Sequence, residues 1–435
     1  MLPCMTVPDA MAQVVEAVRG AFTAPTFETF RLLVDGMLRA TGEHTVTGVW
    51  VAAGMAGRRH WARAHRFFAQ ARWDPDTLGL LLARLVVMLF APSGDLVVVV
   101  DDTLFQRGGK KVYGAAWQHD GAARGRDGLG RGNCFVVCGL AVDVPFMGRK
   151  VHLPLLFRLH VPRQGPSKTE QARALVGLIA RAFPERRLHV VADAAYRGKA
   201  WRTLPTSVTF TTRLAANAVL YEVPPTGVAG AANKRGHPVW RGPKLGSLAQ
   251  IAHAAAWHSA TATVYGKATT IQYTTIEALW WGSMHRTPVR VVLTRDPGSS
   301  KPFDFALVST DLATSALDLI VRYSWRWPIE QTIKDCKLLL GAGDARSRVQ
   351  AAVERTVPFQ MLCLTILFCW YQTHGADTDL NAYRTERPWY RHKSTVSVDD
   401  ILIAYRRARI NPIHPAQSTP EQTPTQTLTS ALAAA

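Results

Sequence analysis

Residues 97–103 have the sequence VVVVDDT, in which four β-branched residues run directly into two aspartates and a threonine. β-Branched side chains favour strands, and an unbroken apolar run is typical of a strand buried on both faces of a sheet. Carboxylates at the end of such a strand are costly to bury unless they are paired or bind a cation. The stretch therefore predicts a central strand with a functional site at its carboxyl end.

The composition predicts a globular protein with a polyanionic partner. The chain has 435 residues, 48% of them hydrophobic, which is enough for a substantial core and for two or three domains. Its 51 Lys and Arg against 32 Asp and Glu give a net charge of +19. Nucleic acid is the first partner that such a charge suggests, and an arginine-rich composition without a specific ligand is the alternative.

Neither a membrane span nor a metal-binding cysteine motif is expected from the sequence. The longest apolar run, residues 358–371, is interrupted by Gln360 and Thr365 and predicts a buried helix. The amino terminus, MLPCMTVPDAM, lacks a basic and then apolar signal pattern, so we expect no membrane partner and a cytoplasmic location. The six cysteines lack zinc-site spacing and are expected to be reduced thiols.

The periodicity of apolar residues changes near residue 93. Before it, five short apolar segments separated by Gly, Pro or Asp predict a small helical domain. After it, strands at 95–103, 133–144 and 150–161 precede a helix at 167–183 and a strand at 187–196. This order predicts an α/β fold, a mixed sheet flanked by helices. Long helices are expected at 314–340 and 347–373, and a short one near 397–409.

The expected division of the chain has six parts. They are a helical DNA-binding domain (1–92), two parts of a catalytic domain (93–213 and 287–375), a β-rich insertion between them (214–286), a helical segment (376–414) and a disordered tail without an expected role (415–435).

Arg59, Arg63 and Arg66 are predicted to share one face of a helix over residues 58–73, because they follow one another at i, i+4 and i+7. A basic helix that recognises DNA and an ordinary solvated arginine face both fit this pattern.

The segment 106–132 is too long for a hairpin turn and is rich in glycine and basic residues. Lys110 and Lys111 lie near Tyr113 and Trp117, a combination that suits contact with a DNA backbone. A loop of this length is expected to be functional or disordered.

A second carboxylate follows a second apolar run. Within the strand expected at 187–196, Asp193 comes directly after apolar residues, as Asp101 does in the first strand. If these strands are neighbours, both acids meet at one edge of the sheet, where sites of α/β proteins form. Two nearby carboxylates repel each other unless a cation lies between them. Hard divalent cations such as Mg²⁺ prefer oxygen ligands, so the pair predicts a metal site.

A helix near the end of the fold carries a third acid. At about 100° per residue, Tyr323, Arg326, Glu330 and Lys337 fall within a stripe of roughly 60° on one helix face. Pro328 favours a fresh helix start, so the projection holds firmly for Glu330 and Lys337 alone.

These motifs together resemble a known family. D-D-T at Asp101, A-D-A-A-Y at Asp193 and the spacing Y-x2-R-x3-E-x6-K from Tyr323 are similar to the DDE transposases of bacterial insertion sequences that carry the Y-R-E-K signature. The resemblance runs from roughly residue 25 to residue 375. It implies a ribonuclease H-like catalytic domain with a β-rich insertion between the second and third acids.

The resemblance also implies an activity and its participants. Asp101, Asp193 and Glu330 would hold two Mg²⁺ ions, with Mn²⁺ as a substitute, for DNA cleavage and strand transfer. Tyr323, Arg326 and Lys337 would hold phosphates. The expected partners are double-stranded DNA, both element ends and target, and a second copy of the chain on paired ends, at the bacterial nucleoid.

Three questions stay open in the sequence. Only one of Asp101 and Asp102 can face the site from a regular strand; the family's D-x-T spacing selects Asp101, and Asp102 would cap a turn or support the site. Trp280 and Trp281 are candidates for stacking on a flipped base, as the resemblance implies for an aromatic residue of the insertion, but aromatic core packing is the favoured interpretation. A catalytically inactive DNA-binding protein and a nuclease that cleaves without joining are the competing functions.

Overall fold

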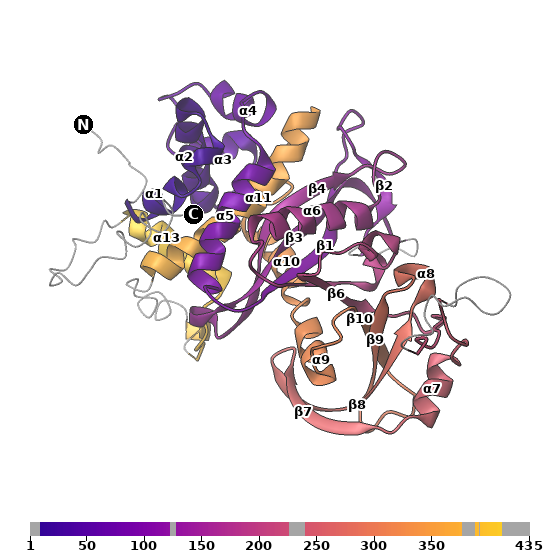
Figure 1. Ribbon diagram of the computed structural model, residues 1–435. Coiled ribbons are helices and arrows are strands. Elements are labelled where there is room, and N and C mark those ends of the chain that lie inside the picture. Colours follow the sequence, from indigo (N-terminus) through magenta and orange to yellow (C-terminus); the bar gives the residue numbers. More distant parts are fainter. Residues whose placement is uncertain (1–8, 122–127, 226–239, 376–387, 391, 411–435) are drawn as a thin grey trace.

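The VVVVDDT stretch lies at the centre of a large mixed sheet. The computed structural model describes residues 9–121, 128–225, 240–375, 388–390 and 392–410 (Figure 1). Strand β1 (Leu96–Gln106) pairs antiparallel with β3 and parallel with β5. The ten-stranded sheet has the order β2-β3-β1-β5-β6-β10-β9-β8-β7, and β4 also pairs with β3. The other strands are β2 (Ala116–His119), β3 (Leu129–Val144), β4 (Arg149–His160), β5 (Leu188–Ala192), β6 (Val208–Arg213), β7 (His258–Val264), β8 (Lys267–Leu279), β9 (Pro288–Arg295) and β10 (Phe305–Ser309).

Helices cover both faces of this sheet, which confirms the predicted α/β class. In Figure 1 the amino-terminal helices gather at one end of the sheet, while α7 and the β7–β8 hairpin lie at the other. The helices are α1 (Asp9–Glu16), α2 (Ala24–Arg39), α3 (Val46–Ala52), α4 (Ala62–Ala69), α5 (Pro75–Phe90), α6 (Lys168–Ala182), α7 (Leu248–Ala254), α8 (Trp281–Met284), α9 (Ala316–Ser324), α10 (Pro328–Leu339), α11 (Gln350–Trp370) and α13 (Val398–Ile410). The short 3-10 helices η3 (Ala194–Tyr196) and η4 (Lys199–Trp201) follow β5.

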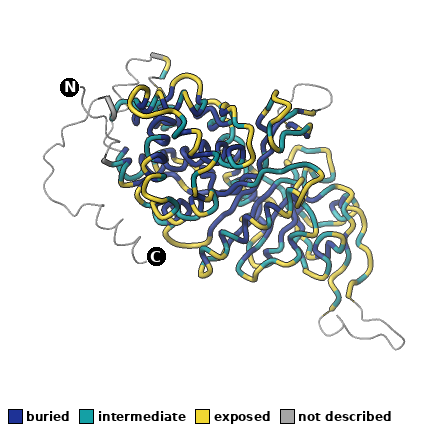
Figure 2. The backbone as a smooth tube through the Cα atoms, turned by 90° about the horizontal axis from the view of Figure 1, so that it is seen from above, coloured by how far each residue is buried: buried dark blue, intermediate teal, exposed yellow. Residues whose placement is uncertain are grey.

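Side chains of β1 alternate between two core layers. Val97 and Val99 pack with residues of α9 and α10, whereas Val98 and Val100 pack with the larger core that includes α6. The tube in Figure 2 shows that the buried backbone follows the strands through the middle of the molecule. Both faces of β1 are thus dry up to Val100, as the apolar run predicts.

The basic segment 106–132 is more ordered than expected. Residues 116–119 form β2, which pairs antiparallel with an amino-terminal extension of β3 at residues 129–132. The sequence AWQH is too short and too poor in β-branched residues to predict a strand by itself. Residues 122–127 lie outside the described part of the chain.

The helix expected at 314–340 is two helices, so a single continuous helix is wrong. Helix α9 ends at Ser324 and α10 begins at Pro328, which occupies the first turn. Proline has no N–H to donate, so it fits the first turn of a helix, where that group would have no partner within the helix.

The strands of segment 214–286 belong to the same sheet as the catalytic strands. β8 pairs along its carboxyl-terminal half with β9, and β7 forms the outer edge. The division into domains at 214 and 286 stays a prediction, and so do the expectations for the tail at 415–435, which lies outside the described residues.

One helix of the described residues is apolar and long enough by composition to cross a membrane. It spans Gln350–Gly375, and 89% of its most apolar window is buried inside the protein. Helix α11 packs against β4 and α5, in agreement with the buried helix predicted at 358–371.

Gly79 allows α5 to approach β4 closely. A Cβ atom at residue 79 would lie 2.0 Å from the Leu155 carbonyl oxygen. We expect Gly79→Ala to lower the free energy of unfolding by about 1–3 kcal/mol through overpacking, measured by chemical denaturation. Gly177→Ala in α6 is the matched control: its nearest neighbours would be the mobile ends of Arg173 and Arg181, so it should be neutral or stabilising. Equal losses in both variants would contradict the close approach.

Candidate active site

Asp101 and Asp193 follow two neighbouring parallel strands. The last paired residues of β1 and β5 are Val100 and Ala192, and each is followed by one of the two acids. The two strands are therefore neighbours, which is the condition under which both acids lie at the same edge of the sheet. The Asp193 carboxylate accepts a hydrogen bond from the Ala195 N–H and caps η3. The Asp193 carbonyl accepts one from Thr212 Oγ1 at 2.8 Å.

Arg326 connects Asp101 to Glu330. Its Nη1 donates to Asp101 Oδ2 at 3.2 Å and its Nη2 donates to Glu330 Oε1 at 2.7 Å. The side chains of Asp101 and Arg326 are only 20% and 14% exposed, and that of Glu330 is 40% exposed. One guanidinium thus serves two carboxylates from different elements, a strand and the first turn of α10.

Burial disturbs the ionisation of Asp101. Desolvation raises the pKa of Asp101 from 3.8 to about 7, and the charges of Asp102 and Asp193 act in the same direction. The Asp102 N–H and the Arg326 charge oppose this rise without cancelling it. Burial of Asp101 is thus the main reason that its carboxyl keeps a proton more readily than an exposed aspartate does.

Lys337 and Tyr323, the other two residues of the Y-R-E-K pattern, differ in their surroundings: Lys337 lines a cavity, whereas Tyr323 is buried in the core. Lys337 Nζ donates to Thr103 Oγ1 at 2.7 Å and to the Leu104 carbonyl at 2.9 Å, on β1 beyond Asp101. Lys337 also lines a cavity of about 360 Å³. Tyr323 is buried in the layer between α9 and the sheet, and desolvation raises its pKa to about 12.

Asp102 points to the opposite face of β1. Its carboxylate binds Lys168 and Tyr196, whereas Asp101 meets Arg326. The structure thus places Asp101, and not Asp102, beside Arg326 and Glu330, as strand alternation and the D-x-T spacing predict.

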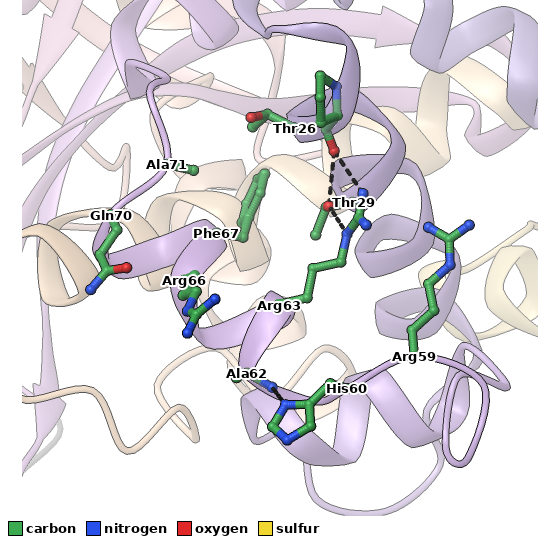
Figure 3. Close-up of a pocket in the computed structure, with 11 residues that line it drawn as sticks. Thr26, Thr29, Arg59, His60, Ala62, Arg63, Arg66, Phe67, Gln70 and Ala71 are labelled. Atoms are coloured by element: carbon green, nitrogen blue, oxygen red, sulfur yellow. Dashed lines mark hydrogen bonds between the residues drawn. The ribbon is translucent and has the colours of Figure 1, made fainter.

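Arg59, Arg63 and Arg66 line a cavity of about 880 Å³ between α2 and α4 (Figure 3). Their predicted helical alignment is wrong for Arg59, because α4 begins only at Ala62. Arg59 and Arg63 both pair with Glu28, at 2.7 and 3.4 Å. Arg66 is exposed in α4, so the cavity keeps an excess of positive charge.

Lys110 and Lys111 lie in an exposed turn between β1 and β2. Of the two aromatic residues near them, Trp117 is 69% exposed and Tyr113 is 36% exposed. The exposure agrees with a surface for contact, although the structure does not bring these lysines to the acids.

Trp280 and Trp281, the candidates for stacking on a base, differ in their surroundings. Trp280 is buried in the core, whereas the ring of Trp281 lies 4.2 Å from that of His285, with the two planes tilted by 43°. The sequence analysis missed another aromatic pair, Trp327 and Tyr265, whose rings meet edge to face at 6.1 Å. Both are more than half exposed, and Trp327 directly follows Arg326. Its place in S-W-R-W-P was the available signal, whereas the partner in the β7–β8 turn could not be inferred.

Comparison with known families now decides the class of protein. The sequence matches the DDE superfamily endonuclease family over residues 17–285. This chain belongs to that family. The matched region contains Asp101 and Asp193 and ends before Glu330. No curated protein matches the chain significantly.

Membership of the DDE endonuclease family indicates a transposase-like nuclease whose substrate is DNA. Enzymes of this superfamily generally use divalent metal ions, and the donor chemistry here fits them. Asp101, Asp193 and Glu330 offer only oxygen ligands. Burial is the main cause of the raised pKa of Asp101, with a smaller contribution from the charges of Asp102 and Asp193, and a cation at this position would favour the ionised carboxylate. Among the residues that the structure describes, no group of three Asp, Glu, His or Cys side chains is close enough together to hold one metal ion. Arg326 takes the cation's electrostatic role between Asp101 and Glu330.

The raised pKa of Asp101 makes stability depend on pH. Between pH 3.8 and about 7 the folded chain holds more protons at this carboxyl than the unfolded chain, so the free energy of unfolding falls as the pH rises. Asp101→Asn removes the contribution of this carboxyl to the pH dependence of the free energy of unfolding. We expect the melting temperature of Asp101→Asn, relative to wild type, to increase as the pH is raised from 5 to 8 without metal.

Asp143→Asn is the control for this pH series, because Asp143 is 75% exposed in its surface pair with Lys150. Its difference from wild type should stay flat across the series. A flat difference for Asp101→Asn as well would contradict a desolvated carboxyl at residue 101.

Proposed function

We propose that this DDE endonuclease is an insertion-sequence transposase that binds the terminal inverted repeats of its element and catalyses metal-dependent strand cleavage and strand transfer. The observation that carries the proposal is the chain of contacts from Asp101 through Arg326 to Glu330, with Asp193 at the end of the neighbouring strand. Asp101 and Asp193 follow neighbouring strands, and Arg326 joins Asp101 to Glu330. The three acids occur along the chain in the order that the Y-R-E-K resemblance implies, which supports the proposal.

The chemistry needs no nucleophile from the protein. Two Mg²⁺ ions, or Mn²⁺ in their place, would be held by Asp101, Asp193 and Glu330 and would activate the attacking hydroxyl and stabilise the leaving oxyanion. In cleavage a water oxygen bonds to phosphorus and the strand leaves with a free 3′-hydroxyl. In transfer that 3′-hydroxyl attacks a phosphodiester of the target, so one bond forms as another breaks.

Arg326 has two consecutive roles in this proposal. Without metal it neutralises part of the charge of Asp101 and Glu330, which lie 3.2 and 2.7 Å away. With the acids held by cations, its planar N–H groups become free to donate to oxygens of the scissile phosphate. Lys337, on the same side of β1, would hold a neighbouring phosphate, and Tyr323 would support the layer beneath Arg326.

DNA binding would use the basic and aromatic surfaces outside the acids. The cavity of Arg59, Arg63 and Arg66 has the charge to bind a backbone phosphate, and Lys110 and Lys111 would follow the backbone elsewhere. Trp327 and Tyr265 offer exposed rings beside Arg326 that would stack on bases or sugars near the cleaved bond. We further propose a homodimer on paired ends and keep the bacterial cytoplasm, at the nucleoid, as the expected location.

Two competing functions differ from the proposal in what happens to DNA. An inactivated binder would occupy DNA without cutting it, and the retention of all three acids with Arg326 argues against such decay. A nuclease without strand transfer would cut but not join, so the products of the reaction separate it from a transposase.

The first test of the proposal is cleavage and joining of a labelled DNA that carries the element end, with Mg²⁺, by wild type and by Glu330→Gln. Loss of one carboxylate ligand removes charge stabilisation worth several kcal/mol, so we expect product formation to fall about 100-fold or more. Binding measured by gel shift should be retained. Glu354→Gln on α11 serves as the control with wild-type activity, because the Glu354 carboxylate accepts an exposed hydrogen bond from Gln350 Nε2 of the same helix and is not one of the three acids.

Each contrary outcome of this assay selects another interpretation. Binding without cutting by wild type would favour the inactive binder, and cutting without joining would favour the nuclease. Normal cutting by Glu330→Gln would remove Glu330 from the catalytic set.

The arginine cavity gives a prediction of its own. We expect Arg66→Ala to weaken binding of element-end DNA several-fold at 100 mM salt and to reduce the slope of log K against log salt by about one, because one phosphate contact releases about one counterion. Arg84→Ala, an exposed arginine of α5 outside this cavity, is the control with an unchanged slope. Unchanged slopes for both variants would show that the cavity does not bind DNA.

A further inference from the structure

The parallel ladder between β1 and β5 stops one residue before the two acids. Val100 and Ala192 are the last pair, and beyond them the chain of β5 turns into η3. No backbone bond of this ladder then fixes Asp193 relative to Asp101. A metal site tolerates little variation in the spacing of its ligands, so some other contact must set that distance.

A cluster on the back of β1 supplies such a contact. The Tyr196 hydroxyl donates to Asp102 Oδ1 at 3.0 Å, and Lys168 Nζ donates to Asp102 Oδ2 at 2.6 Å. Cys134 Sγ of β3 lies 3.2 Å from the same Oδ2. Asp102 thus joins β1 to β3, to the first residue of α6 and to the end of η3, on the face opposite Arg326.

Tyr196 belongs to the turn that Asp193 caps. The Tyr196 N–H donates to the Asp193 carbonyl at 3.1 Å, while the Asp193 carboxylate accepts from Ala195. A displacement of the Tyr196 ring would therefore turn the carboxylate of Asp193. The hydrogen bond from Tyr196 to Asp102 therefore connects the end of β5 to β1 beyond the last backbone pair, Val100 and Ala192.

The ring of Tyr196 is also fixed from behind. Tyr196 is 1% exposed, and its carbonyl accepts a hydrogen bond from Trp201 Nε1 at 2.7 Å. Trp201 stacks on Phe210 of β6 at 4.2 Å, with the ring planes 11° apart. The hydroxyl thus reaches Asp102 from a rigid support.

We infer that Asp102, Lys168 and Tyr196 are positioning residues that hold Asp193 at the distance from Asp101 at which both carboxylates bind one set of divalent ions. The inference rests on the proposed function, since it concerns the same acids. Asp102 connects β1 to Tyr196 through its hydrogen bond with the tyrosine hydroxyl. Lys168 compensates the charge of Asp102, so that the two adjacent aspartates do not place two uncompensated charges at the end of the strand. None of the three residues touches DNA or metal in this scheme.

The inference is tested by calorimetric titration of Mn²⁺ into the full-length protein without DNA. Tyr196→Phe removes only the hydroxyl, and we expect it to raise the Kd for Mn²⁺ about tenfold, as loss of a group that orients a ligand generally does. Tyr405→Phe is the matched control: the Tyr405 hydroxyl is equally buried and donates to Asp35 Oδ1 at 2.7 Å, in the helical part of the molecule. Its Kd should stay within twofold of wild type, with a comparable change in melting temperature.

A second pair of variants guards against misfolding of Tyr196→Phe. Lys168→Met should weaken Mn²⁺ binding, and Lys168→Arg, which keeps the charge beside Asp102, should restore it. The inference is overturned if Tyr196→Phe binds Mn²⁺ as wild type does, if Tyr405→Phe loses as much affinity, if Lys168→Met and Lys168→Arg behave alike, or if wild type binds no Mn²⁺. Because no DNA is present, failure of the protein to cut DNA would refute the proposed function and leave this result standing.

Discussion

The alternation of side chains across a single strand is the constraint on which the site depends. Asp101 and Asp102 are adjacent, and a regular strand sends them to opposite faces. Two carboxylates at the end of a buried strand cost much free energy unless each finds a cation. Here Arg326, in the turn before α10, meets one, and Lys168 of α6 meets the other, so the strand end is bonded to both helical layers. These two ion pairs lower the free-energy cost of burying the acids and also hold the two helical layers against the sheet.

The electrostatic balance on the front face is incomplete, and this has a functional meaning. Arg326 faces two carboxylates while a third, Asp193, acts on Asp101 from the next strand. A site with full compensation would have little affinity for a cation, whereas a site without any would be hard to fold. One guanidinium shared by two acids lies between these limits. Arg326 compensates part of the negative charge of Asp101 and Glu330, and the remainder is what divalent ions would neutralise under the proposed function.

The parts of the fold that could be predicted are those encoded by local patterns. The apolar runs of 96–100 and 188–192 predicted two buried strands and the position of their acids, and Pro328 marked the start of α10. Contacts between distant segments could not be predicted. Neither the pairing of β2 with β3 nor the meeting of Tyr265 with Trp327 leaves a periodic signal, since each depends on how separate segments pack. Arg59 was misplaced for a related reason: the turn before Ala62 shortens α4, and helix ends are set by capping and packing more than by propensity.

Glu330 shows how packing can place a candidate catalytic residue that lies outside the region of family similarity. The family match ends at residue 285, well before this acid. The orientation of α10 about its own axis determines where Glu330 lies relative to the sheet. Ile329 and Cys336 are fully buried, and Thr332 Oγ1 donates to the His152 carbonyl of β4 at 2.8 Å. With that side of the helix held against the sheet, the residue after Ile329 lies about 100° around the helix, at the margin between core and solvent. Arg326 meets Glu330 at that margin and joins it to Asp101, so the third acid is placed by the core beneath it rather than by its own charge.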